Sequence, residues 1–155
     1  MTELAGVMPG HSEELLCFKL GSQDFAIEIK SAREIRSWIK AEELPDTPSH
    51  VLGVTNLRGE MLPVIDLATK LGLRSSEVSE RSVVIVADIN RTAVGLLVDA
   101  VSDIIAPTTD DIQSPPAAVN EDADQSTRGL TMLGDKMVRV LDLSSIFPDE
   151  ATKAH

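Results

Sequence analysis

Two aspartates are the carboxylates best placed for acid–base chemistry in this sequence. Asp66 and Asp142 lie in the similar segments VIDLATKL and VLDLSSIF, each directly after apolar residues. Such a pair could serve a hydrolase as general acid and general base. The same residue before a short segment of helical spacing is also typical of a helix N-cap. We favour capping for both, and a small acidic β-barrel hydrolase that uses Asp66 and Asp142 stays as an alternative.

The other reactive residue types do not gather into a site. The histidines, His11, His50 and His155, are too dispersed to indicate a metal centre or a Ser-His relay. The glycines form neither a dinucleotide fingerprint nor a Walker loop. Cys17 lies in an apolar run, where we expect a small buried residue rather than a nucleophile. The sequence therefore predicts no catalytic residue, no metal site and no cofactor, and hence a protein that is not an enzyme.

A hairpin is the remaining candidate for recognition by another molecule. In GVTNLRGEMLPVIDL, residues 53–67, strand-type apolar residues flank the turn residues Asn56, Arg58, Gly59 and Glu60. An arginine beside a glycine on a tight turn projects outward. Alternatively, Gly59 only supplies a positive φ, and Arg58 and Glu60 form a solvated pair. Taken alone, the hairpin favours this second interpretation.

Size and charge limit the class of protein. The chain has 155 residues, 43% of them hydrophobic, which suffices for one domain or two small fused lobes. A formal net charge of -11 disfavours binding to nucleic acid or to an anionic membrane. Residues 1–13 have the composition of a flexible leader and residues 151–155 that of a tail, and no signal peptide or membrane-spanning segment is evident. We expect a cytoplasmic protein without nucleic-acid partners or direct membrane insertion.

The segments that carry these residues repeat within the chain. Leu15–Ile35 aligns without a gap with Val84–Ile104, a constant difference of 69 residues, and apolar positions match throughout. Val64–Leu71 aligns with Val140–Phe147 at a difference of 76 residues, because the second copy has a longer Pro-rich and acidic loop. Each copy predicts a hairpin, a linking strand, a second hairpin and a short closing helix.

The repeat predicts a mainly all-β fold. About five short strands in each copy suit a small closed barrel, in which closure removes unpaired edges. We expect one domain over residues 14–150, with a first lobe at about 14–72 and a second at about 81–148, and strands that can swap between the lobes.

The hairpin motif also resembles a known family. GVTNLRGEMLPVIDL is similar to the signature of the CheW family of chemotaxis coupling proteins, and further similar segments follow in order: FAIEIKSAREI, AVGLLVDAVSDII and GLTMLGDKMVRVLDL. The resemblance extends from Glu14 to Phe147. It implies two intertwined five-stranded β-barrels with short helices and a groove between the lobes.

The resemblance further implies a function. Members of this family are non-enzymatic adaptors that bridge the cytoplasmic signalling tip of chemoreceptors to the regulatory domain of the histidine kinase CheA, with which they can form rings in membrane-associated receptor arrays. A same-fold adaptor in a non-chemotactic pathway, such as surface motility or second-messenger control, stays as an alternative.

The receptor-binding residues are assigned by the same resemblance. Glu34 and Arg58 match the family's acid and base, with an ion pair between them that holds the hairpin tip, and a receptor helix is expected to dock in the groove beside them. The full predicted set is Ala32, Glu34, Ile35, Asn56, Leu57, Arg58, Gly59, Val98 and Val101. The surface that contacts the kinase is not assigned.

Overall fold

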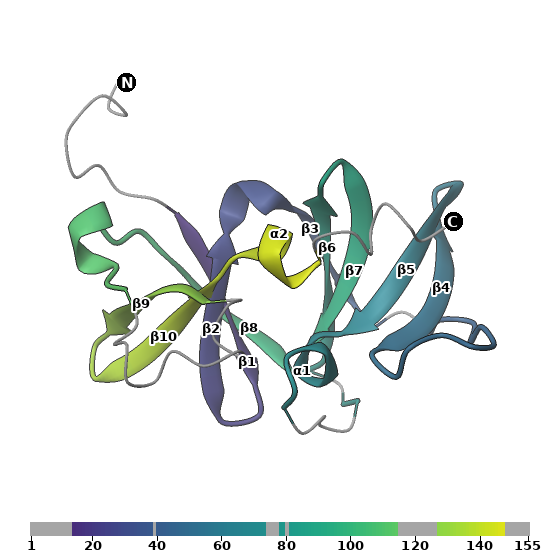
Figure 1. Ribbon diagram of the computed structural model, residues 1–155, viewed down its shortest axis with the longest axis horizontal. Coiled ribbons are helices and arrows are strands. Elements are labelled where there is room, and N and C mark those ends of the chain that lie inside the picture. The colour runs from purple at the N-terminus through teal and green to yellow at the C-terminus, as the bar shows by residue number, and fades with distance from the viewer. Residues whose placement is uncertain (1–13, 39, 74–77, 80, 115–126, 148–155) are drawn as a thin grey trace.

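The computed structural model describes residues 14–38, 40–73, 78–79, 81–114 and 127–147 (Figure 1). The described elements, in chain order, are β1 (Leu15–Leu20), β2 (Gln23–Glu28), the 3₁₀ turn η2 (Ile29–Ser31), β3 (Ala32–Ser37), β4 (Val51–Leu57), β5 (Glu60–Asp66), α1 (Leu67–Lys70), β6 (Val83–Ile89), β7 (Thr92–Val98), β8 (Ala100–Ile105), η3 (Thr109–Asp111), β9 (Thr127–Leu133), β10 (Lys136–Leu141) and α2 (Leu143–Ile146). The prediction of a mainly β fold is confirmed.

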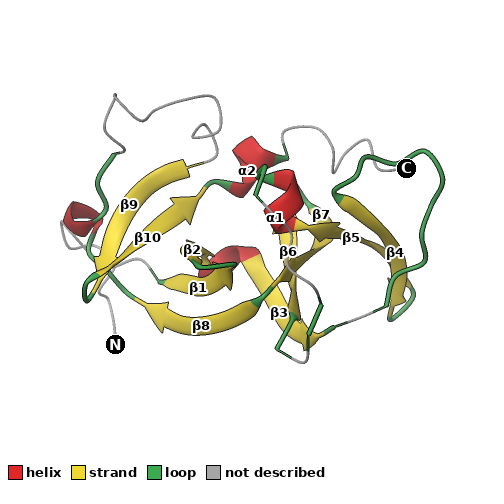
Figure 2. Ribbon diagram, turned by 90° about the horizontal axis from the view of Figure 1, so that it is seen from below, coloured by secondary structure: helices red, strands yellow, loops and turns green. Residues whose placement is uncertain are grey.

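The strands form two five-stranded sheets of matching order. The first sheet runs β8-β1-β2-β10-β9 and the second β3-β6-β7-β5-β4 (Figures 1 and 2). In each sheet one parallel contact, β2 with β10 or β7 with β5, joins two antiparallel groups. The predicted repeat accounts for this agreement, because Val140 pairs with Ala26 and its counterpart Val64 pairs with Gly95.

The two sheets exchange one strand with each other. β3 follows β2 in the chain but pairs with β6 of the second sheet, and β8 follows β7 but pairs with β1 of the first. The first sheet thus combines β1 and β2 with β8, β9 and β10, and the second contains β3 to β7. Each half of the chain, about 14–72 and about 81–148, contributes strands to both sheets.

The central hairpins are buried on both faces. Leu16, Phe18 and Leu20 of β1 face a cluster shared by the two sheets, whereas Leu15 and Cys17 face a smaller cluster inside the first sheet. The second copy repeats this pattern in β6 and β7. Burial on both faces explains why these segments are nearly continuous apolar runs. It also confirms Cys17 as a core residue, and loss of hydration raises the pKa of its thiol to about 11.

Both aspartates of the repeat cap short helices. Asp66 accepts hydrogen bonds from the backbone N–H and the hydroxyl of Thr69, at 3.4 and 3.0 Å. Asp142 accepts from Ser144 N at 3.1 Å and from Ser145 Oγ at 2.9 Å. The capping predictions are therefore confirmed. Gly72 follows α1 with a φ of 81°, as predicted for its end, whereas Pro148 lies outside the described residues.

Two loop segments help to close the sheets. Glu42, after β3, forms a backbone bridge with Val54 of β4, and Gln113, after β8, forms the equivalent bridge with Leu130 of β9. A glycine beside each bridge permits the close approach, since a Cβ on Gly53 would lie 2.1 Å from the Glu42 carbonyl oxygen. These bridges cover part of the edge strands β4 and β9.

Candidate partner-binding site

The β4–β5 hairpin ends in a two-residue turn with Arg58 at its tip. Leu57 and Glu60 are the last paired residues, and both turn residues have positive φ, 51° at Arg58 and 87° at Gly59. This combination is typical of a type I′ turn, whose twist matches that of the strands. The side chain of Asn56 accepts a hydrogen bond from Gly59 N at 2.9 Å. The local sequence thus holds Arg58 at the end of a defined hairpin.

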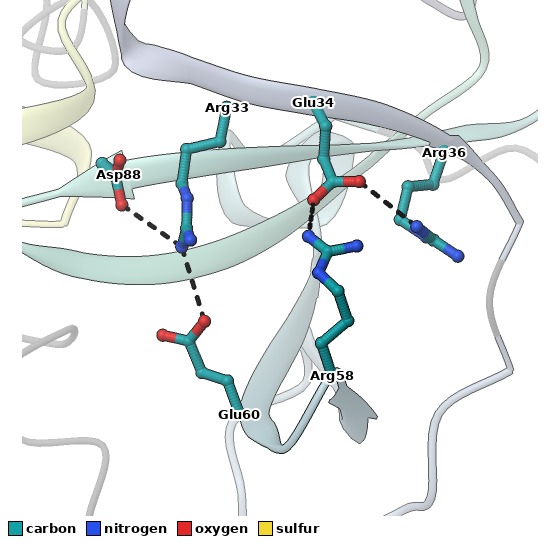
Figure 3. A network of polar contacts seen from close by, with 6 residues as sticks. All are labelled: Arg33, Glu34, Arg36, Arg58, Glu60 and Asp88. Carbon is teal, nitrogen blue, oxygen red and sulfur yellow. Dashed lines mark hydrogen bonds and ion pairs between the residues drawn. The ribbon is translucent and has the colours of Figure 1, made fainter.

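Glu34 of β3 is the partner of Arg58. The Arg58 guanidinium donates to the Glu34 carboxylate, which also accepts from Arg36 Nη1 at 3.2 Å (Figure 3). The expected ion pair is therefore present. The Arg58 side chain is 61% exposed and that of Glu34 is 27% exposed, so the base keeps most of its contact with solvent. The hydrogen bond from Arg58 is the main cause that lowers the pKa of the Glu34 carboxyl, and the same contact raises the pKa of Arg58.

This ion pair joins opposite edges of one sheet. β3 and β4 are the two outer strands of the second sheet, so the β4–β5 tip contacts β3 only because the sheet curves. Exposed ion pairs contribute little to stability, because water and salt screen them. Their main effect here is to fix the position of the hairpin tip relative to β3.

A β-bulge places a third arginine beside this pair and Arg36. The register of β3 against β6 shifts between Ala32 and Glu34, so Arg33 is the extra residue. A bulge breaks the alternation of side chains along a strand and can redirect one of them. Arg33 Nη1 lies 3.5 Å from Glu60 Oε1 and 3.6 Å from Asp88 Oδ1 (Figure 3). Glu60 therefore forms its ion pair with Arg33, and its electrostatic effect on Arg58 is smaller than that of Glu34.

The structure brings together only part of the predicted site. Glu34, Asn56, Arg58 and Gly59 meet at the hairpin tip, and Ile35 is 46% exposed on β3. Leu57 packs against the small cluster inside the second sheet, and Ala32 and Val101 pack against the shared core.

Val98 differs from the others in its environment. It is 1% exposed and belongs to the shared core, because the apolar face of β7 on which it lies is covered by the first sheet. The structure therefore does not place Val98 on a surface that a partner could reach, and we leave it out of the site discussed below.

A small cleft lies between the two sheets. One cleft is lined by residues of both sheets, among them Glu28, Asp88, Arg128 and Asp142, and its volume is about 70 Å³. A helix does not fit into this cleft, and neither Arg58 nor Glu34 lines it.

Sequence reasoning missed Arg33, Arg36 and Asp88 as members of the charged site. Alternation along β3 predicts that Arg33 and Glu34 lie on opposite faces of the sheet. The bulge breaks this alternation and brings both side chains to the hairpin tip. Asp88 is followed by Asn90 and Arg91, polar residues that are typical of a turn rather than of a binding site. The one available signal was the composition of residues 33–36, in which arginines lie on both sides of Glu34 and Ile35.

The second copy of the repeat lacks the charged site. The bulge recurs in β8, where Ser102 and Asp103 stand at the places of Arg33 and Glu34. The turn of the β9–β10 hairpin reads Gly134-Asp135 in place of Arg58-Gly59. The same scaffold is therefore present twice, with the arginine-rich network on one copy.

Two further observations bear on other kinds of site. Within the described residues, no three or more His, Cys, Asp or Glu side chains are grouped as metal ligands would be. In the same part of the chain, none of the helices has the length and apolar character that crossing a bilayer needs.

Comparisons with known proteins identify the family. Residues 14–151 match the CheW-like domain. The chain is 40% identical over 154 residues to "Chemotaxis protein CheW" of Rhizobium meliloti, with 99% of both chains covered. It is 34% identical over 150 residues to the protein of the same name from Klebsiella aerogenes, covering 97% of this chain and 89% of that protein. The crystal structure of the scaffolding protein TtCheW from Thermoanaerobacter tengcongensis superimposes with a TM-score of 0.82 at 28% identity, covering 95% and 93% of the two chains. The chain belongs to the CheW family.

Proposed function

We propose that this protein is a non-enzymatic adaptor that couples the signalling tips of chemoreceptors to the histidine kinase CheA in chemosensory arrays. The observation that carries the proposal is the exposed Arg58 at a hairpin tip held by Glu34. This arrangement occurs in a chain that matches proteins named as chemotaxis proteins over nearly their full length. The adaptor works in the cytoplasm and reaches the membrane through the receptors.

The receptor-binding surface in this proposal is the hairpin tip together with the adjacent part of β3. Arg58, Glu34 and Asn56 supply polar contacts, and the exposed side chain of Ile35 supplies an apolar one. A charged pair at the rim of an interface contributes mainly to orientation and to the rate of association. The kinase-binding surface stays unassigned.

The capping contacts of Asp66 and Asp142 weigh against the hydrolase alternative. Each carboxylate already accepts two hydrogen bonds from its own short helix. Catalysis would require at least one of them to release these bonds and to face a substrate.

Binding of two partners by one chain tests the proposal. The purified protein should bind a soluble chemoreceptor signalling fragment and, separately, the regulatory domain of CheA. Arg58→Asp should weaken receptor binding about tenfold or more, because it places a second carboxylate beside Glu34. Aspartate tolerates the left-handed backbone of this position, so the melting temperature should change little.

Lys136→Asp is the matched control, since it changes the net charge by the same amount at the exposed end of the β9–β10 hairpin. It should leave receptor binding unchanged. Failure of the unaltered chain to bind either partner would contradict the adaptor function, and equal losses from both variants would contradict the role of Arg58.

A further inference from the structure

The charged site at the hairpin tip has two halves with opposite net charge. In one half, Glu34 is shared by two guanidinium groups, those of Arg58 and Arg36. In the other half, Arg33 is shared by two carboxylates, those of Glu60 and Asp88. Figure 3 shows the halves side by side, with Asp88, Arg33 and Glu60 next to Glu34, Arg58 and Arg36. The first half thus carries a formal excess of one positive charge and the second an excess of one negative charge.

These groups are available to a partner. The side chains of Glu60 and Asp88 are about half exposed, and so are those of Arg33 and Arg36 to a slightly smaller degree. Both contacts of Arg33 are longer than 3.2 Å, so its guanidinium neutralises the two carboxylates only in part. Each half therefore still attracts an opposite charge at close range.

The positive half differs in charge from the rest of the chain. The protein has a formal net charge of -11, so a local excess of arginine stands against an acidic background. The second copy of the repeat carries no such pattern, since Ser102, Gly134 and Lys136 replace Arg33, Arg58 and Glu60.

We infer that the two halves fix the direction in which a helical partner lies across the hairpin tip. The partner has a carboxylate that faces Arg58 and Arg36, and a basic side chain that faces Glu60 and Asp88, with Ile35 offering an apolar contact on β3. Reversal of the helix would bring like charges together at both halves, which is unfavourable. This inference rests on the proposed receptor binding and adds to it the negative half, centred on Arg33, Glu60 and Asp88.

Charge reversal in the negative half is the test. The dissociation constant for a soluble chemoreceptor signalling fragment is measured at low salt with the unaltered full chain, with Asp88→Lys and with Glu60→Lys. Each variant should bind at least about fivefold more weakly, because the basic side chain of the partner then meets a positive surface. Thermal unfolding confirms that each variant is folded, and two independent variants guard against an effect of either on the hairpin itself.

Asp135→Lys is the matched control. It makes the same change in net charge at the exposed turn of the β9–β10 hairpin, and it should bind within twofold of the unaltered chain. Every Lys and Arg at the tip of the receptor fragment is then changed singly to Glu. One of these changes should restore the binding of Asp88→Lys.

The outcomes separate the inference from the proposed function. Binding of Asp88→Lys and Glu60→Lys within twofold of the unaltered chain overturns the inference, and so does a loss of equal size in Asp135→Lys or the absence of any restoring change. In these cases Arg58→Asp would still show whether the hairpin tip binds the receptor. If the unaltered chain does not bind the fragment, the proposed function fails and the inference fails with it.

Discussion

Arg58 combines two roles that depend on different parts of the residue. Its backbone adopts a φ of 51°, which is unfavourable for most side chains, and its guanidinium contacts Glu34 across the curved sheet. Glycine or asparagine would suit the backbone better. An arginine at this position is therefore explained by its side chain, and the exposed guanidinium is its most accessible part.

The pH dependence of Glu34 reports on this contact. Arg58 lowers the pKa of the Glu34 carboxyl below 4.5, so the contribution of the pair to stability is present above pH 4.5 and is lost as the pH falls through the lowered pKa. NMR titration of the carboxyl carbon should therefore give a midpoint below 4.5 in the unaltered protein. In Arg58→Met the midpoint should rise towards 4.5, and an unchanged midpoint would contradict the pair.

Only part of the site could be predicted at this scale. The resemblance of GVTNLRGEMLPVIDL to the CheW family identified Arg58 and Glu34, whereas local turn chemistry alone favoured a pair between Arg58 and Glu60. The bulge that turns Arg33 towards Glu60 and Asp88 has no signature in the alternation of β3. The burial of Val98 depends on which face of β7 the other sheet covers, and periodicity does not reveal this.

The β4–β5 hairpin is the element that presents the charge. Its turn keeps Arg58 and Gly59 at positive φ, and Asn56 fixes the backbone of Gly59. The turn and the charge can be separated experimentally, because asparagine is a preferred residue of type I′ turns and has no positive charge.

Arg58→Asn should therefore retain the stability of the protein while reducing receptor binding. The melting temperature should stay the same or rise slightly, because asparagine adopts a positive φ with less backbone strain than arginine does. Binding of a receptor signalling fragment should fall about as much as in a charge-removing variant such as Arg58→Met. Full binding by Arg58→Asn would mean that the turn, and not the guanidinium, is recognised.

Most strands and both short helices were predictable because the internal repeat contains a similar sequence for each of them in both copies. The hairpins at 15–28 and 83–98, the caps at Asp66 and Asp142, and the linking strands near Glu34 and Asp103 all follow from apolar alternation and turn residues. Agreement between the two copies supported each assignment.

At the scale of the whole molecule, the exchange of β3 and β8 unites the two sheets. The expected swapping of strands between the lobes does not say which strands exchange, because the apolar alternation of β3 is the same whether it pairs with β1 or with β6. The shared core contains residues of both sheets and of both short helices, including Leu67 and Phe147. Each sheet thus covers an apolar face of the other.

The exchange predicts how fragments behave. A fragment of residues 1–79 contains β3, β4 and β5 without the β6 and β7 that pair with them, so it should show little β structure and no cooperative unfolding. A shorter fragment, residues 30–99, contains every strand of the second sheet and should retain more β structure by circular dichroism. A cooperative thermal transition in the 1–79 fragment alone would contradict the exchanged pairing.

Kinase activation in a reconstituted array is the most direct test of the adaptor function. CheA autophosphorylation is measured with receptor signalling fragments and either the unaltered protein, Arg58→Asp or the control Lys136→Asp. The unaltered protein and the control should raise the rate well above that of CheA with receptor alone, whereas Arg58→Asp should raise it little. Equal activation by Arg58→Asp and the unaltered protein would contradict the account of the hairpin tip, and no activation by the unaltered protein would contradict the coupling function itself.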